Sequence, residues 1–174
     1  MACTLTKGFA LDCADNIGGI EEILITNLEN VSAFTVLAGE ITAITQVALT
    51  DFYRYELEQE DADALTTETK SVENGTVFFE TVLNFTMDKL TKEKSEELKL
   101  LATARKLAII YKLASGSYNA IGFDRGAMKF GGTNQAATGK AYGDKQGYTL
   151  GFTSKETHYP YFVDATVVSG LTIA

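Results

Sequence analysis

Short runs of β-branched and aromatic residues, separated by glycine and asparagine, fill the N-terminal third of the chain. These runs cover residues 20–26, 30–37, 40–49 and 51–58. In the last run Tyr53 and Tyr55 alternate with Arg54 and Glu56, which is the period of a strand with one buried face. Strand-length runs joined by short breaks are typical of neighbouring antiparallel strands, so the pattern predicts an antiparallel meander.

A β-hairpin and then an amphipathic helix are predicted in the middle of the chain. Asn74-Gly75 separates two alternating runs, which is a strong hairpin signal. The face of the second run that we expect in the core consists of Val77, Phe79, Thr81, Leu83, Phe85 and Met87. From Thr91, a residue type that favours helix N-caps, the apolar spacing becomes that of an amphipathic helix over residues 91–107. The sequence therefore predicts one clear helix that packs on a sheet by one stripe.

Strand patterns return after this helix and continue towards the C-terminus. They cover residues 106–113, 117–124, 147–156 and 161–168. No linker or repeat divides the chain, and 174 residues with 45% hydrophobic content suffice for one packed core. We therefore expect a single domain over residues 1–174, mainly β with one α-helix, built as an antiparallel β-sandwich or barrel.

Acidic residues are concentrated in the first part of the sequence. The net charge of the chain is −8; residues 1–75 carry three basic and 14 acidic residues, whereas residues 76–174 carry 12 basic and nine acidic residues. Nucleic-acid-binding modules rely on Lys and Arg to release counterions, so this composition argues against one. The densest acidic run, ELEQEDAD at residues 56–63, is interpreted as an exposed loop. Alternatively, it forms a surface that meets the basic part of another copy or repels DNA.

Gly139-Lys140 matches the end of a phosphate-binding loop only in part. In that alignment Asn134 replaces the first glycine and Ala141 replaces the hydroxyl that binds magnesium. A strand pattern follows where the motif requires a helix. This stretch is therefore interpreted as a tight connection into a strand rather than a nucleotide site.

No catalytic, metal or cofactor site is predicted. His158 is the only histidine, and we expect it to be a solvated loop residue, because no serine or cysteine lies in a nucleophile motif. Cys3 and Cys13 lack the paired spacing of a zinc site; they could form a disulfide, but we expect two free thiols. A hydrolase that uses scattered carboxylates stays open, because acidic residues are numerous.

Targeting signals are not evident in the sequence. No apolar run approaches the length that spans a membrane, and the first 19 residues lack the apolar stretch of a signal peptide. We therefore expect no membrane contact and assembly in a cytoplasm.

The order of elements from residue 70 to residue 165 resembles that of bacteriophage tail tube proteins. A long strand, NGTVFFETVLNFTMDKL, leads to the helix TKEKSEELKLLA and the hairpin ARKLAIIYKLASGSYNAIGF. The glycine-rich segment ATGKAYGDKQGYTLGFTSKE and the HYPYFV segment follow. The chain is also similar, more loosely, to inner-tube proteins of related injection machines, and most similar to structural proteins of phages with Bacteroidetes-type hosts.

This resemblance implies a virion structural protein of the phage tail with no catalytic residues. Such subunits form homo-hexameric rings that stack into a tube, contact other virion tail proteins, and let double-stranded DNA pass without specific binding. From length and charge, we expect residues 56–75 to form the loop that reaches a neighbouring ring. The candidate interface residues are Glu56, Glu58, Glu60, Asp61, Asp63, Lys140 and Lys145.

Three other functions are compatible with the sequence. In the same class, the chain could be a head–tail connector, a tail terminator or a capsid-decorating protein. In another class, it could be a β-barrel module that binds a small ligand or a glycan. The third is the hydrolase considered above.

Overall fold

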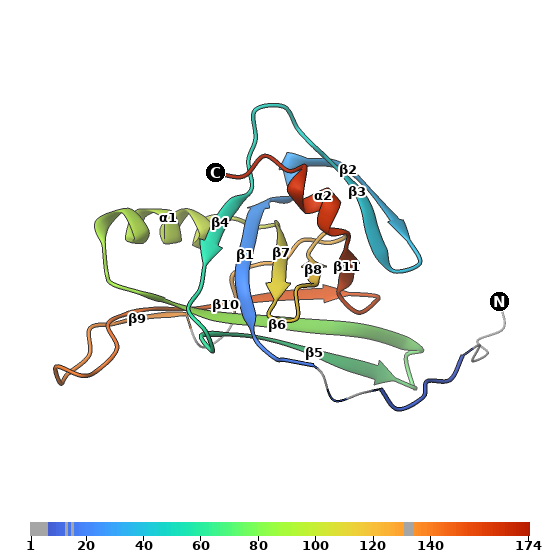
Figure 1. Cartoon of the computed structure of the whole chain (residues 1–174), viewed down its shortest axis with the longest axis horizontal. Helices are drawn as coiled ribbons and strands as arrows, with labels where there is room; N and C mark the ends of the chain where they lie inside the picture. The colour runs from blue at the N-terminus through green and yellow to red at the C-terminus, as the bar shows by residue number, and fades with distance from the viewer. Residues whose placement is uncertain (1–6, 13, 15, 131–133) are drawn as a thin grey trace.

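The computed structural model of the chain describes residues 7–12, 14, 16–130 and 134–174. Its strands form one sheet of seven strands and one of four, which face one another (Figure 1). One substantial helix, α1 (Lys92–Thr103), packs against the core between the sheets. The fold is therefore mainly β with a sandwich of two sheets, as the sequence predicted.

The seven-stranded sheet has the order β2-β3-β11-β8-β7-β1-β4. Its strands are β1 (Ile20–Asn27), β2 (Val31–Leu37), β3 (Glu40–Gln46), β4 (Tyr53–Glu56), β7 (Leu107–Leu113), β8 (Tyr118–Ile121) and β11 (Tyr161–Val163). All neighbours are antiparallel except β11 and β3, which are parallel. A short 3-10 turn, η1 (Leu28–Asn30), separates β1 from β2.

The predicted N-terminal meander is confirmed only for β2 and β3, which pair antiparallel, and is wrong for β1 and β2, which do not pair. β1 pairs with β7 and β4, and β2 pairs with β3 at the far end of the sheet. β1 and β7 carry apolar residues at successive positions, so both of their faces need cover. In the middle of the sheet, with a hydrophobic core on each side, both faces of these two strands are buried.

The four-stranded sheet has the order β5-β6-β10-β9, and every pair is antiparallel. Its strands are β5 (Ala62–Ser71), β6 (Thr76–Asp88), β9 (Gln135–Ala137) and β10 (Gly147–Glu156). The predicted hairpin is confirmed: Ser71 pairs with Thr76, and Gly75 has a φ of 62° in the connecting turn. Glycine adopts this left-handed conformation without the steric cost that a side chain brings.

The seven-stranded sheet has one hydrophobic core on each face. Ile23 and Ile25 of β1 lie in the core between the two sheets with Phe152 of β10, whereas Leu24 points to the other face. On that other face, Val168 of α2 (Ala165–Ser169) helps to cover the sheet. Successive residues of one strand therefore stabilise two different cores.

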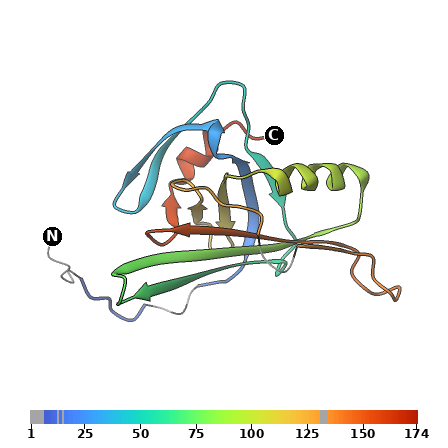
Figure 2. The same cartoon turned by 180° about the vertical axis from the view of Figure 1, so that it is seen from behind.

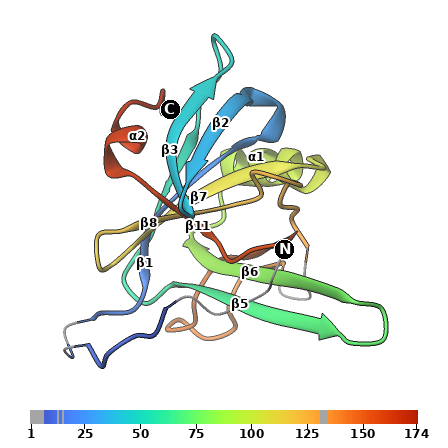
Figure 3. The same cartoon turned by 90° about the vertical axis from the view of Figure 1, so that its right-hand side faces the viewer.

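The predicted core face of β6 is only partly buried. Leu83 and Phe85 are fully buried, whereas Val77 at the start of the strand is 42% exposed. Figures 2 and 3 show the reason: the β5–β6 hairpin extends past the seven-stranded sheet, so that sheet does not cover its far end. The alternation predicts which way a side chain points but not how far the opposite sheet reaches.

The predicted strand at residues 161–168 is correct only for its first three residues. β11 ends at Val163 and α2 begins at Ala165. The Asp164 carboxylate accepts a hydrogen bond from the Thr166 backbone N–H at 2.8 Å and so caps this helix. The cap overrides the strand propensity of the β-branched residues that follow.

Four strands are left at sheet ends, because neither sheet closes into a barrel within the described residues. They are β2 and β4 of the larger sheet and β5 and β9 of the smaller one. β5 pairs along its whole length with β6 alone, and most of its residues are exposed. Within the part of the chain that the structure describes, no strand pairs with its second edge, which is called the free edge of β5 below.

Candidate functional site

The candidate interface residues do not form one loop. Residues 56–75 were expected to project as a loop, but Glu56 ends β4 and Asp63 lies within β5. Only the short connection that contains Glu58, Glu60 and Asp61 is irregular, together with the turn at 72–75. The expectation failed because the threonine-rich residues after the acidic run favour a strand once β6 is available as a partner.

Lys145 and Asp61, both predicted to lie at a subunit interface, pair within the same chain. The Lys145 ammonium donates hydrogen bonds to both carboxylate oxygens of Asp61 at 2.9 and 2.8 Å, and to the Thr86 hydroxyl at 2.9 Å. It also lies 3.4 Å from a carboxylate oxygen of Asp88. Hydrogen bonding to Lys145 lowers the pKa of Asp61, and the bond to Asp61 raises the pKa of Lys145.

Strand register brings this cluster together. β10 begins opposite the end of β6, where Gly147 pairs with Asp88, and this places Lys145 beside that end. The Thr86 backbone N–H donates to the Asp61 carbonyl at 3.1 Å, which fixes the entry into β5 at the same place. Three segments far apart in sequence therefore meet at one point.

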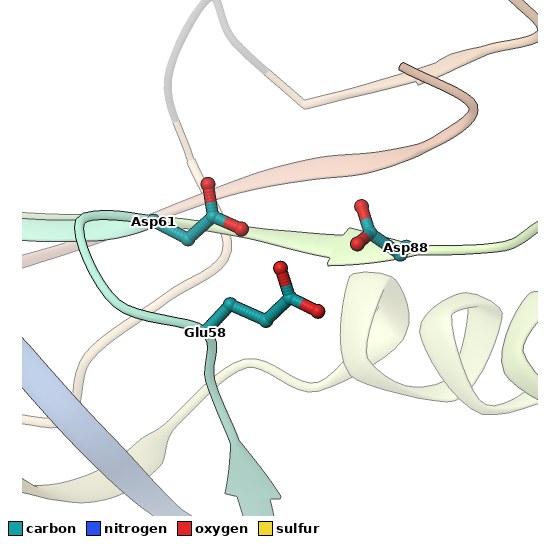
Figure 4. Close-up of side chains that lie close together, drawn as sticks. All are labelled: Glu58, Asp61 and Asp88. Atoms are coloured by element: carbon teal, nitrogen blue, oxygen red, sulfur yellow. The ribbon is translucent and has the colours of Figure 1, made fainter.

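Glu58, Asp61 and Asp88 point towards one another in Figure 4, with one carboxylate oxygen of each within 4.8 Å of the others. Carboxylates at this separation could coordinate a divalent cation. The ammonium of Lys145 already contacts Asp61 and Asp88 and supplies positive charge there. The cluster is therefore described as an ion-pair network rather than a metal centre.

Lys140 differs from Lys145 although both lie in the β9–β10 connection. The backbone N–H groups of Lys140 and Ala141 each donate to one Asp144 carboxylate oxygen at 2.8 Å, and these bonds lower the pKa of Asp144. Within the described residues, the Lys140 side chain makes no ion pair. The connection leads from β9 into β10 with no helix, as expected for a turn rather than a phosphate-binding loop.

His158 is not the solvated loop residue that the sequence suggested. Its Nε2 lies 2.7 Å from a carboxylate oxygen of Asp124, and its Nδ1 lies 2.7 Å from the Tyr159 carbonyl oxygen. The ring stacks on Tyr161 at a centroid distance of 3.9 Å. The signal was missed because Asp124 is 34 residues away in the sequence.

Glu156, two residues before His158, is a buried carboxylate. Its side chain accepts backbone hydrogen bonds from Gly122 at 3.0 Å and from Asp124 at 3.4 Å. Burial is the largest influence on this group and raises the pKa of Glu156. The carboxylate therefore fastens the β8–β9 connection to the end of β10.

An open groove of about 590 Å³ lies beside β5. Ala62 and Ala64 of β5 form one wall, and Tyr111 lines the groove from the larger sheet. Tyr159 and Phe162, both 56% exposed, lie at its rim. The groove is mainly apolar and adjoins the free edge of β5.

Large apolar side chains are exposed on separate projecting segments. Five of them are at least 85% exposed: Phe9, Leu11, Leu49, Val72 and Tyr142. They lie in the N-terminal arm, the β3–β4 connection, the β5–β6 turn and the β9–β10 connection. In Figure 1 the arm and the β5–β6 turn extend to the right, the β3–β4 connection extends to the top, and the β9–β10 connection extends to the lower left. Leu49 also has a φ of 65°, which is unfavourable for a side chain of this size.

Comparisons of the chain with family models, with curated proteins and with solved structures found no match in any of the three. Among the described residues, no helix has the length and apolar character needed to span a membrane. Cys3 and Cys13 lie outside the described residues, so their predicted free thiols stay a prediction. Function is therefore inferred from the residues and geometry of the chain itself.

Proposed function

We propose that the chain is a self-assembling structural subunit, and specifically a bacteriophage tail tube protein that forms stacked homo-hexameric rings in the virion tail. The observation that carries the proposal is the exposure of Leu11, Leu49, Val72 and Tyr142 on four separate projections. Single exposed apolar residues are common on protein surfaces. Here each one lies on a segment that extends away from the body, where a neighbouring molecule could bury it.

The free sheet edges support the same proposal. An unpaired strand is a template for pairing with another chain. β5 offers ten residues with one edge that no other described strand pairs, and β2 and β9 end their sheets as well. The outer edge of β4 is different, because the C-terminal segment 172–174 forms hydrogen bonds with Phe52 and Arg54 there. A subunit with such edges can extend its sheets into its neighbours around a ring.

The charge supports a channel for DNA. A net charge of −8 disfavours adhesion to the phosphate backbone. Lys145, one of the two basic residues proposed for the interface, is neutralised by Asp61 and Asp88 within the chain. Contacts between copies would then depend on apolar projections and strand edges more than on ion pairs between acidic and basic halves.

Negative-stain microscopy and light scattering of the purified chain test the proposal. Rings or stacked tubes are expected. A strict monomer at high concentration, together with its absence from virion tails, would refute the tube function. Single rings that never stack would favour a connector or terminator instead.

Substitutions on the projections sharpen this test. Leu49→Ser and Tyr142→Ser remove side chains that are exposed in the subunit, so each should leave the melting temperature of the monomer unchanged and reduce assembly. Gln146→Ser, a change at an exposed polar position of the same β9–β10 connection outside the candidate interface residues, is the matched control. If all variants assembled equally, the exposed apolar side chains would not drive assembly, and the proposal would lose its main support.

A second candidate function is a module that binds a small ligand or a glycan. It is favoured by the groove of about 590 Å³, with the aromatic rings of Tyr159 and Phe162 at its rim. Ligand pockets commonly have this size and apolar lining. A rise in melting temperature with added sugars, abolished by Tyr159→Ala in a chain that stays monomeric, would favour this function over a tube.

A further inference from the structure

The only histidine of the chain connects the β10–β11 turn to a distant loop. His158 is largely buried, with 23% of its side chain exposed. Its Nε2 contacts Asp124 of the β8–β9 connection, and its Nδ1 contacts the carbonyl oxygen of Tyr159 in its own turn, each at 2.7 Å. The Tyr161 hydroxyl donates to the same Asp124 oxygen at 3.2 Å, beneath the stacked histidine ring.

Both ring nitrogens of His158 face oxygen atoms that accept hydrogen bonds. A carbonyl and an ionised carboxylate have no proton to donate, and a neutral imidazole carries only one N–H. A neutral ring therefore keeps one of the two contacts and turns a lone pair towards the other oxygen. The imidazolium donates to both, so this geometry is satisfied by the protonated ring.

The turn that His158 anchors forms part of the groove beside β5. Tyr159 packs on Phe79 at a centroid distance of 4.4 Å, and its hydroxyl donates to Glu68 of β5 at 3.4 Å. Tyr159 and Pro160 both line the groove. A change in the position of the turn would therefore change the rim of this groove.

The titratable groups that face the ring are Asp124 of the β8–β9 connection, Tyr161 of β11 and Glu156 of β10. Glu68 of β5 reaches the same turn through the Tyr159 hydroxyl. Histidine is the side chain that ordinarily changes charge between pH 5 and pH 8. Glu156 is buried next to the same loop, so its titration could also change this loop with pH. A variant at Glu156 is therefore needed to separate its effect from that of His158.

We propose that His158, Asp124 and Tyr161 form a proton-dependent latch at the rim of the groove. The protonated ring fastens the β10–β11 turn to the β8–β9 connection. Loss of the proton breaks one of the two contacts, releases the turn and changes the surface that the groove presents. The latch belongs to the single subunit, so it operates whether or not the chain assembles.

Hydrogen exchange of the full chain, read by mass spectrometry, tests the latch. Wild type and His158→Gln are compared at the same pH, so that intrinsic exchange rates cancel. At pH 5.5 the segment 157–163 should exchange several-fold more slowly in the wild type, and at pH 8 the two proteins should exchange equally. Tyr161→Phe keeps the stacked ring and should retain the pH step, whereas Asp124→Asn should lose it.

Two further measurements complete the test. Because the chain has one histidine, its ring gives one titrating NMR signal, and the amide signals of residues 122–125 and 157–162 should shift with the same midpoint. Glu156→Gln should leave this midpoint visible. A ratio of exchange rates that is independent of pH, or amide shifts that do not follow the ring, would overturn the proposal.

Discussion

Replacing Lys145 by methionine tests whether this residue acts within the subunit or between subunits. The change keeps an unbranched side chain, one atom shorter, and removes the ammonium that contacts Asp61 and Asp88. Glu58, Asp61 and Asp88 then face one another without the ammonium that contacts two of the three carboxylates. We expect the folded subunit to lose stability.

The size of this loss follows from the exposure of the pair. The Lys145 side chain is 46% exposed and that of Asp61 25%, so solvent screens the attraction and the values for surface ion pairs apply. Two hydrogen bonds to one carboxylate place the pair at the upper end of that range, at about 1 kcal/mol. For a chain of this length, this corresponds to roughly 2–4 °C in melting temperature.

The dependence on pH has a definite sign. Hydrogen bonding to Lys145 lowers the pKa of Asp61 in the folded state, so the stability it contributes is complete above the ordinary pKa of 3.8. That stability is lost as the pH falls through the lower folded-state value. The difference in the free energy of unfolding between wild type and Lys145→Met should therefore be largest at pH 7 and disappear towards pH 2. It should also become smaller in 1 M salt.

Thermal and urea unfolding at several protein concentrations provide the assay. Lys140→Met is the matched control, because it removes an equivalent charge that makes no ion pair in the described structure, and its effect should stay within about 0.5 kcal/mol. Equal losses for the two variants would refute the reasoning. A loss for Lys145→Met that appears only at high protein concentration would restore the interface role.

Three more predictions concern stability. Glu156→Gln keeps an acceptor oxygen but cannot ionise; because burial raises the pKa of Glu156, the variant should gain stability relative to wild type as the pH rises above 4.5, seen in melts at pH 4 and pH 7. Phe152→Ala, at a fully buried position, should cost about 3–5 kcal/mol in urea unfolding. Thr91→Ala removes the N-cap acceptor of α1 and should cost about 1 kcal/mol, whereas Thr91→Ser should cost much less. A loss with Thr91→Ser equal to that with Thr91→Ala would contradict the capping role.

The sequence alone determined the elements whose signals are local. The hairpin at Asn74-Gly75, the helix cap at Thr91, and the inward direction of Leu83 and Phe85 depend on neighbours a few residues away. The mainly β class follows from the same runs of β-branched and aromatic residues. Rejection of a phosphate-binding loop at residues 134–141 was equally local, because it needed only the motif and the strand that follows.

The tertiary structure decided everything that depends on pairing at long range. The alternation of apolar and polar residues along a strand does not identify its partner strand. The pairing of β7 with β1 is explained only in the folded chain, where two strands that are apolar on both faces need cover on each face. For the same reason the sequence could not show that Lys145 neutralises Asp61, or that Asp124 faces His158 across 34 residues. Charges and hydrogen-bonding groups carry no sign of their partners in the sequence, since register and turn geometry bring those partners together only in the folded chain.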